Sequence, residues 1–206
     1  RTKIVASEDD FLIEDLIAEE DMVVTLTHRG YIKRLPADTY KTQRRGGRGV
    51  TAMQTRGDDF VEHVFVASTH AYLCCFTDRG KMYRKKVFEI PEASRQARGT
   101  AIVNLMAVEP GEKITAVIPV RDGTEGQYMF MATRQGVVKK TTLEVFANAR
   151  ASGIIAISLR DNDELIDVRL TDGKHQVVLI TENGYAIRFS EEDVRSMGRN
   201  AYGVKG

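Results

Sequence analysis

"TDRGKMYRKK" occupies residues 77–86, and similar segments occur three more times in this 206-residue chain. They are "THRGYIKR" (27–34), "TRQGVVKK" (133–140) and "TENGYAIR" (181–188). Each has a threonine, a glycine three residues later, and a basic residue three or four positions after the glycine. The glycines are 50, 56 and 48 residues apart, which indicates an internal repeat of about 50 residues.

A second series of glycines keeps a nearly constant phase with the first, 17 or 19 residues after it: Gly49, Gly99, Gly153 and Gly203. The segments between the markers are rich in β-branched and aromatic residues, as in "FVEHVFVAS", "AYLCCFT", "KMYRKKVFEI" and "GTAIVNLMAV". This pattern predicts four short strands per repeat, with the first glycine at positive φ in a tight hairpin.

The repeat predicts an all-β fold, a propeller-like pinwheel of four-stranded blades. The approximate repeats are residues 11–57, 58–108, 109–160 and 161–206, of which the last is incomplete, so we expect the natural protein to continue beyond Gly206. A β-sandwich is the alternative, although it does not require such regular phase. The one helix-compatible stretch, "SEDDFLIEDLIAEED", aligns equally well with a first strand.

Composition indicates a globular protein, with 42% hydrophobic and 29% charged residues. No segment approaches the roughly 20 apolar residues of a membrane span, so a cytoplasmic location is expected. Cys74 and Cys75 are neighbours in an apolar run, where a strand points them to opposite faces, and we expect reduced packing residues. No GxxxxGK[ST], HExxH or GxSxG motif occurs, and neither a catalytic residue nor a metal site is predicted.

Basic residues recur on the third strand of each repeat although the chain's net charge is only +1. The predicted contacts on this basic rim are Lys33, Arg34, Arg84, Lys85, Lys86, Lys139, Lys140 and Arg188. In a ring of blades they would form a belt on the perimeter. A belt of separated cations suits a long, curved polyanion, and double-stranded DNA is the candidate.

The heptapeptide "QRRGGRG" at residues 43–49 concentrates the same chemistry. Arginine offers a planar fork of donors to phosphate oxygens, and glycine lets a backbone approach a bulky partner. The predicted DNA-binding residues are Gln43, Arg44, Arg45, Gly46, Gly47, Arg48 and Gly49. "SRQAR" (94–98) is a weaker copy in the next repeat.

With this heptapeptide and the constant spacing of the two glycine series, the whole chain resembles the C-terminal domain of the bacterial DNA gyrase A subunit. "QRRGGRG" matches the family's signature, the gyrase A box, at all seven positions. The resemblance implies a six-bladed pinwheel with strands exchanged between adjacent blades, of which four repeats are visible here. It also implies that DNA wraps around the basic rim to direct ATP-dependent negative supercoiling.

The resemblance further implies that the chain is a non-catalytic part of a type II DNA topoisomerase. Its expected partners are double-stranded DNA, the B subunit, and the N-terminal part of the A subunit, in an A2B2 holoenzyme of the bacterial cytoplasm and nucleoid, with no membrane. No cofactor is expected in this domain, because ATP and Mg²⁺ are used elsewhere in the holoenzyme.

Three alternatives remain open from the residues. A topoisomerase IV-type C-terminal domain is similar in blade pattern, but usually has a degraded or missing box. A propeller-type protein-interaction scaffold predicts binding that is insensitive to salt. An RNA binder of the RGG type predicts a preference for single strands.

Overall fold

The computed structural model describes residues 13–40, 53, 57–121 and 123–206, which form short β-strands joined by turns and single-turn 3-10 helices. The strands are β1 (Asp21–Thr27), β2 (Tyr31–Pro36), β3 (Val61–Ser68), β4 (Tyr72–Thr77), β5 (Lys81–Lys86), β6 (Thr100–Ala101), β7 (Ile114–Val120), β8 (Tyr128–Thr133), β9 (Val137–Thr142), β10 (Ile154–Ile155), β11 (Leu165–Thr171), β12 (Gln176–Ile180), β13 (Ala186–Ser190) and β14 (Val204–Lys205). The 3-10 helices are η1 (Ile13–Leu16), η2 (Ala37–Thr39), η3 (Val87–Glu89), η4 (Ile102–Asn104), η5 (Leu143–Phe146) and η6 (Glu191–Asp193). The all-β prediction is confirmed.

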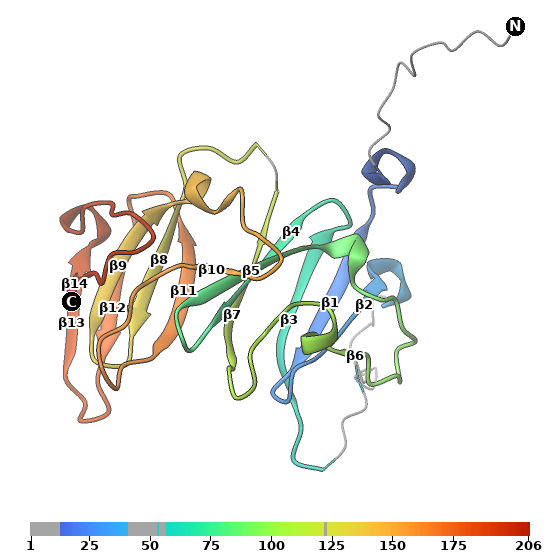
Figure 1. Cartoon of the computed structure of the whole chain (residues 1–206), viewed down its shortest axis with the longest axis horizontal. Helices are drawn as coiled ribbons and strands as arrows, with labels where there is room; N and C mark the ends of the chain where they lie inside the picture. Colours follow the sequence, from blue (N-terminus) through green and yellow to red (C-terminus); the bar gives the residue numbers. More distant parts are fainter. Residues whose placement is uncertain (1–12, 41–52, 54–56, 122) are drawn as a thin grey trace, which may run out of the picture.

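The strands form three four-stranded sheets and one two-stranded sheet, with orders β3-β1-β2-β6, β10-β5-β4-β7, β11-β8-β9-β14 and β12-β13. All of their pairings are antiparallel. Figure 1 shows the sheets following one another along the longest axis, from β1 and β2 at one end to β12 and β13 at the other. This is the succession of blades that a 50-residue repeat requires.

Each four-stranded sheet combines a hairpin of one repeat with two strands of the next repeat. The β1–β2 hairpin, for example, pairs with β3 and β6, and the β4–β5 hairpin pairs with β7 and β10. The strand exchange that the resemblance implies is therefore present, and the sheets are offset from the sequence repeats by one strand. Exchange ties each sheet to its successor through the chain itself.

In the second and third repeats the fourth strand has two residues, which is much shorter than the sequence suggests. In "GTAIVNLMAV" only Thr100–Ala101 pairs with a sheet, and η4 follows at once. The reason lies in the core, because Ile102 and Met106 turn into the cluster between the first two sheets and are 4% and 5% exposed. Burial of these side chains replaces the expected ladder of hydrogen bonds.

The repeated Thr-x-x-Gly element builds the hairpin turn four times. The threonine carbonyl accepts a hydrogen bond from the glycine N–H, and the threonine Oγ1 accepts one from the residue after the glycine. The Oγ1 distances are 3.1 Å for Thr27, 3.3 Å for Thr77, 3.2 Å for Thr133 and 3.1 Å for Thr181. The glycines have φ between 74° and 81°, which explains why the position is glycine in every repeat.

Apolar side chains fill the spaces between successive sheets. Cys75 lies in the cluster between the first and second sheets, and its neighbour Cys74 lies in the cluster between the second and third. Both are free and buried, as predicted. Burial raises the pKa of the Cys74 thiol to about 12, so these cysteines are packing residues with little thiolate at neutral pH.

The described part of the acidic N-terminal stretch begins with η1 and contacts strands of both the first and the second sheet. Glu14 accepts a hydrogen bond from the Lys86 ammonium at 2.8 Å, and Glu19 accepts one from the Ser68 hydroxyl at 3.0 Å. The sequence of this stretch was compatible with a helix or with a first strand, and its described part forms a single helical turn, η1. None of the helices in the described residues is long and apolar enough to cross a membrane.

Candidate nucleic-acid interface

The predicted gyrase A box, residues 43–49, lies outside the residues that the structure describes. The roles of Gln43, Arg44, Arg45, Gly46, Gly47, Arg48 and Gly49 in DNA binding therefore stay predictions. The eight cations of the predicted basic rim all lie on described strands, where their surroundings can be compared.

Lys33 on β2 and Lys139 on β9 are buried, with no exposed surface. The ammonium of Lys33 donates to the backbone carbonyls of Ser94, Arg95 and Ala97 at 3.1, 2.7 and 3.0 Å. Burial lowers the pKa of Lys33. The prediction that Lys33 lies on the exposed rim is thus wrong, because its charge is used inside the protein to satisfy three carbonyl oxygens.

Lys139 has the corresponding position on β9. Its ammonium donates to the carbonyls of Ala156 at 2.6 Å and Arg199 at 2.5 Å. Burial, with a smaller contribution from the Arg199 charge, lowers the pKa of Lys139 to about 8. The rim assignment is wrong for Lys139 for the same physical reason.

Lys86 and Lys140 are also buried, at 6% and 7% exposure. Lys86 binds the Glu14 carboxylate and the carbonyl of His70, and its ammonium lies 3.8 Å from the centre of the Tyr72 ring. Lys140 donates to the carbonyl of Glu191 at 2.7 Å. Their placement on an exposed belt is wrong as well, since these hydrogen bonds hold the chain segments around them.

The other four predicted rim residues keep exposed surface. Arg34 donates through Nε to the carbonyl of Ile90 at 2.7 Å, and Arg84 stacks 3.3 Å over Tyr72 while donating to the carbonyl of Ala147. Lys85 is partly exposed and pairs with Glu89 at 2.9 Å, and Arg188 on β13 is exposed. For these four, contact with DNA stays a prediction.

Further arginines, which strand patterning does not identify, lie outside the strands, and Lys33 and Lys139 bind the backbone of two of them, Arg95 and Arg199. They lie in the loop between each third strand and the second glycine marker. The described members are Arg95, Arg98, Arg150, Arg195 and Arg199. Arg95, Arg150 and Arg195 are exposed, so each described copy of this loop presents at least one guanidinium to solvent.

The loops of the second and fourth repeats are anchored in the same way. Residue 92 forms a parallel bridge with Arg34 of β2, and residue 196 forms one with Lys140 of β9. At the end of each loop the second glycine packs against the preceding sheet. A Cβ on Gly99 would lie 2.5 Å from the carbonyl oxygen of Ile32, and one on Gly203 would lie 2.5 Å from that of Val138. This close approach explains why residues 99 and 203 are glycines.

Two of the loop arginines share one distance from this glycine. Arg95 and Arg199 stand four positions before Gly99 and Gly203. In the box, Arg45 stands four positions before Gly49. By this spacing, the box is the first-repeat counterpart in sequence of the segments that carry Arg95 and Arg199, and it has more arginines than either.

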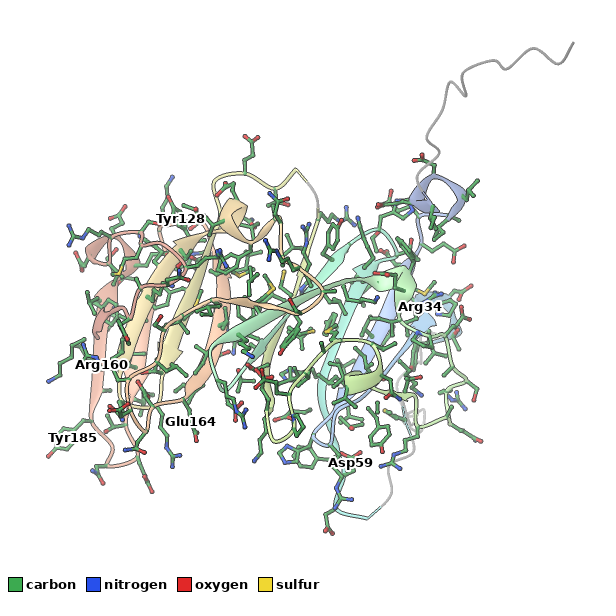
Figure 2. The ribbon with its side chains drawn as sticks, viewed as in Figure 1. Arg34, Asp59, Tyr128, Arg160, Glu164 and Tyr185 are labelled. Carbon is green, nitrogen blue, oxygen red and sulfur yellow. The ribbon has the colours of Figure 1, made fainter. Side chains whose placement is uncertain are left out.

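Arginines at the hairpin turns are in a different electrostatic environment. Arg29, Arg79 and Arg134 each pair with a carboxylate from the following repeat, at 3.7, 3.4 and 3.3 Å. Figure 2 places Asp59 and Glu164, from these acidic segments, along one edge of the molecule. The η5 and η6 turns, which precede loops with Arg150 and Arg195, lie toward the opposite edge (Figure 1). Cations at the hairpin edge are thus locally neutralised.

Exchanged four-stranded sheets in tandem, tied by the buried lysines, define a β-propeller-type domain with arginine-bearing loops. A family model described as the DNA gyrase C-terminal domain, beta-propeller, matches residues 21–68, 71–121, 127–172 and 175–206. The chain belongs to this family. The first three matched segments each contain one hairpin and the first strand of the next repeat, as the observed sheets do.

Individual relatives agree with the family. The DNA gyrase A subunit of Clostridium acetobutylicum is 52% identical over all 206 residues, which make up 25% of that protein. A solved C-terminal domain of DNA topoisomerase IV has a TM-score of 0.79 and 34% identity, covering 92% of this chain and 58% of that one. A solved DNA gyrase A C-terminal domain has a TM-score of 0.72 and 28% identity, covering 91% and 60%. The chain thus spans about a quarter of the length of the gyrase protein that it matches.

Proposed function

We propose that this chain is the DNA-binding and DNA-wrapping domain of a DNA gyrase A subunit. The observation that carries the proposal is the 52% identity to a gyrase A subunit over the full chain. The domain itself performs no chemistry. It bends duplex DNA so that the catalytic part of an ATP-dependent type II topoisomerase introduces negative supercoils.

The DNA path follows the loop arginines together with the gyrase A box, instead of the buried strand lysines. Arg95, Arg150 and Arg195 are exposed, and they recur once per described loop. One exposed arginine in each described loop matters because smooth bending of 20–30 bp by 40–90° costs on the order of 1–6 kcal/mol, which several phosphate contacts must offset. Each phosphate contact releases a counterion and makes the affinity depend on salt.

The buried lysines act as positioning residues for this path. Lys33 gathers carbonyls of residues 94–97, and Lys139 binds the carbonyl of Arg199. Fixing the backbone of a loop reduces the conformational entropy that its arginines lose on binding DNA. Arg34, Arg84, Lys85 and Arg188 keep exposed surface and remain candidates for additional phosphate contacts.

The partners follow from the proposed role. They are double-stranded DNA, the B subunit, and the N-terminal part of the A subunit, in an A2B2 holoenzyme of the bacterial cytoplasm and nucleoid. ATP and Mg²⁺ act elsewhere in that holoenzyme, and we propose that this domain needs no cofactor.

A topoisomerase IV-type role is the second candidate, since the solved topoisomerase IV domain has the higher TM-score of the two compared, 0.79 against 0.72. The complete "QRRGGRG" segment favours gyrase. Replacing residues 43–49 by alanine separates the two, because a gyrase-type domain loses wrapping and a domain that does not depend on the box retains it.

DNA binding is tested by titrating a labelled duplex of about 40 bp, and one of its single strands, with this chain at about 50–200 mM KCl. We expect preference for the duplex, little dependence on its sequence, and an affinity that falls about 0.9 log units per phosphate contact for each decade of salt. Salt-insensitive binding would instead support a scaffold. Preference for the single strand would support an RGG-type binder.

A further inference from the structure

The same pair of backbone positions is hydrogen-bonded in three repeats, but its side chains are ionisable only in the last one. The first residue of η3, η5 and η6 donates its N–H to the carbonyl of the residue that precedes the hairpin. These bonds are Val87 to Ala71, Leu143 to Gln127 and Glu191 to His175, each 2.9 Å. Two of the pairs carry no ionisable group, whereas the third combines an imidazole with a carboxylate.

Glu191 is buried at a position that is apolar in the two preceding sheets, with 0% exposure. One carboxylate oxygen accepts the Thr171 hydroxyl at 2.7 Å, and the other accepts the His175 N–H at 2.7 Å. Burying a carboxylate is costly unless its charge is compensated. Within the part of the chain that the structure describes, His175 is the only residue that forms an ion pair with Glu191.

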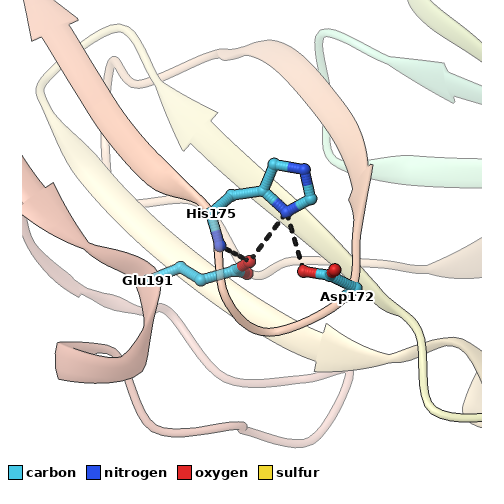
Figure 3. A group of neighbouring side chains, drawn as sticks. All are labelled: Asp172, His175 and Glu191. Atoms are coloured by element: carbon cyan, nitrogen blue, oxygen red, sulfur yellow. Dashed lines mark hydrogen bonds and ion pairs between the residues drawn. The ribbon is translucent and has the colours of Figure 1, made fainter.

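Asp172 completes a three-residue cluster around one imidazole nitrogen. Nδ1 of His175 lies 2.9 Å from Oδ1 of Asp172 and 3.3 Å from Oε1 of Glu191, as Figure 3 shows. All three atoms lie within 4.8 Å of one another. The N–H of Lys174 is the main factor that lowers the pKa of Asp172, and His175 adds to it. Asp172 is therefore a carboxylate at neutral pH.

We propose that Asp172, His175 and Glu191 form a binding site for one divalent transition-metal ion of the Zn²⁺ class. The ligands are Nδ1 of His175 and one oxygen from each carboxylate. Zinc–ligand bonds are about 2.0–2.2 Å long, so ligands around a tetrahedral ion are roughly 3.3–3.6 Å apart. On binding, the observed 2.9 and 3.3 Å separations expand slightly, and the two carboxylate oxygens, which lie within 4.8 Å of each other, adopt the same spacing.

The composition of the site selects the ion. An imidazole with two carboxylates suits Zn²⁺ and neighbouring transition ions, whereas Mg²⁺ and Ca²⁺ prefer oxygen ligands alone. Nδ1 must be unprotonated to bind, so metal binding releases any proton that this nitrogen carries. The side chains of Asp172 and His175 are 59% and 58% exposed, which leaves the ion accessible to water.

Metal binding would connect three parts of the chain at one corner. Asp172 follows β11 of the third sheet, His175 precedes β12 of the fourth, and Glu191 begins η6. Lys140 of β9 donates to the backbone carbonyl of Glu191 at 2.7 Å, which fixes the same segment from the third sheet. The bound ion would therefore link the third sheet to the β12–β13 hairpin.

The test is calorimetric titration of the untagged, metal-free chain with ZnCl₂ in the presence of excess MgCl₂. The matched control is His28→Gln, because among the described residues His28 pairs with one carboxylate, that of Glu62, at 3.2 Å. We expect one Zn²⁺ per chain in the parent and in His28→Gln. Asp172→Asn and His175→Gln should each weaken binding by at least about ten-fold.

Thermal unfolding with and without Zn²⁺ gives a second readout. The ion should raise the Tm of the parent and of His28→Gln, and should leave the Tm of Asp172→Asn nearly unchanged. Asp172 is exposed, so this variant tests the site without disturbing the core. The proposal is overturned if the parent binds no stoichiometric Zn²⁺, or if both site variants bind it as the parent does.

Discussion

The ammonium nitrogen of Lys33 lies 2.7 Å from the backbone carbonyl oxygen of Arg95, 62 residues further along the chain. Lys33 is fully buried, whereas Arg95 is exposed. A buried cation in one repeat therefore fixes the loop that presents a cation of the next repeat to solvent. Lys139 and Arg199 repeat this relationship at 2.5 Å.

Replacing Lys33 by methionine should destabilise the domain. The carbonyls of Ser94, Arg95 and Ala97 would lose their shared donor, and an unsatisfied buried acceptor costs about 1–3 kcal/mol. Urea unfolding should show this decrease in the free energy of unfolding. Lys85→Met is the matched control and should change stability by less than about 0.5 kcal/mol, because Lys85 is partly exposed. Equal losses in both variants would contradict the positioning role.

Replacing Arg95 by alanine should weaken DNA binding about equally on all sequences. Loss of one phosphate contact lowers the slope of log affinity against log salt by about 0.9. Arg134→Ala is the control, since Arg134 is well exposed but paired with Glu164 at 3.3 Å on the hairpin edge. Anisotropy titrations of both variants against salt test this assignment. If Arg134→Ala reduces the slope and Arg95→Ala does not, the DNA path lies on the other edge.

Stability should increase with pH between about 8 and 10 because of Lys139. Its pKa is about 8 in the folded protein, below its ordinary value of 10.5. Between these values the unfolded chain binds more protons, so the free energy of unfolding increases as pH rises. The cost of the buried charge is fully present below about pH 8.

The measurement is the difference in unfolding free energy between the parent and Lys139→Met, taken near pH 7 and again at about pH 9.5. Titration of other groups is common to both proteins and cancels in this difference. We expect the parent to gain stability relative to Lys139→Met as the pH rises. A difference that is constant over this range would show that Lys139 keeps its proton.

Two glycines with similar backbone angles separate conformational strain from steric contact. Gly136 has φ of 78° and no atom within 4 Å of an added Cβ, and Gly136→Ala should cost about 1–2 kcal/mol. Gly99 has φ of 84°, and an added Cβ would lie 2.5 Å from the Ile32 carbonyl. Gly99→Ala should cost about 1–3 kcal/mol more, by overpacking. Urea unfolding measures the loss of unfolding free energy in each variant. Equal losses would show that the loop around Gly99 moves to accommodate the added Cβ without further cost.

The fold was largely predictable because its turns depend on local chemistry. Thr27 and Gly30 show the rule, in which one side-chain oxygen and one positive φ make each hairpin. The sheets themselves were harder to predict from the residues alone. Pairing of β1 with β3 and of β2 with β6 joins different repeats. The sequences of these strands do not indicate which strands they pair with. Only the resemblance implied an exchange of strands.

The site was predictable only in part, because identical residues have opposite surroundings. Lys85 and Lys86 are adjacent on β5, yet Lys85 is partly exposed and Lys86 is buried against Glu14 and Tyr72. Alternation along a strand predicts opposite faces, but the sequence does not reveal that a buried face uses lysine to bind carbonyls. The distance of Arg95 from Gly99 recurs at Arg199 and in the box, but it does not identify Arg150 or Arg195.

The central claim is that exposed loop arginines guide duplex DNA around the domain. The most direct measurement is the linking number of nicked circular DNA that is sealed by ligase in the presence of this chain. We predict a shift in linking number that grows with protein concentration. It should be largely lost when Arg95, Arg150 and Arg195 are all replaced by alanine. It should persist when Arg29, Arg79 and Arg134 are replaced by alanine instead. An unshifted distribution at concentrations where the chain binds DNA, or equal losses in the two triple variants, would contradict the account.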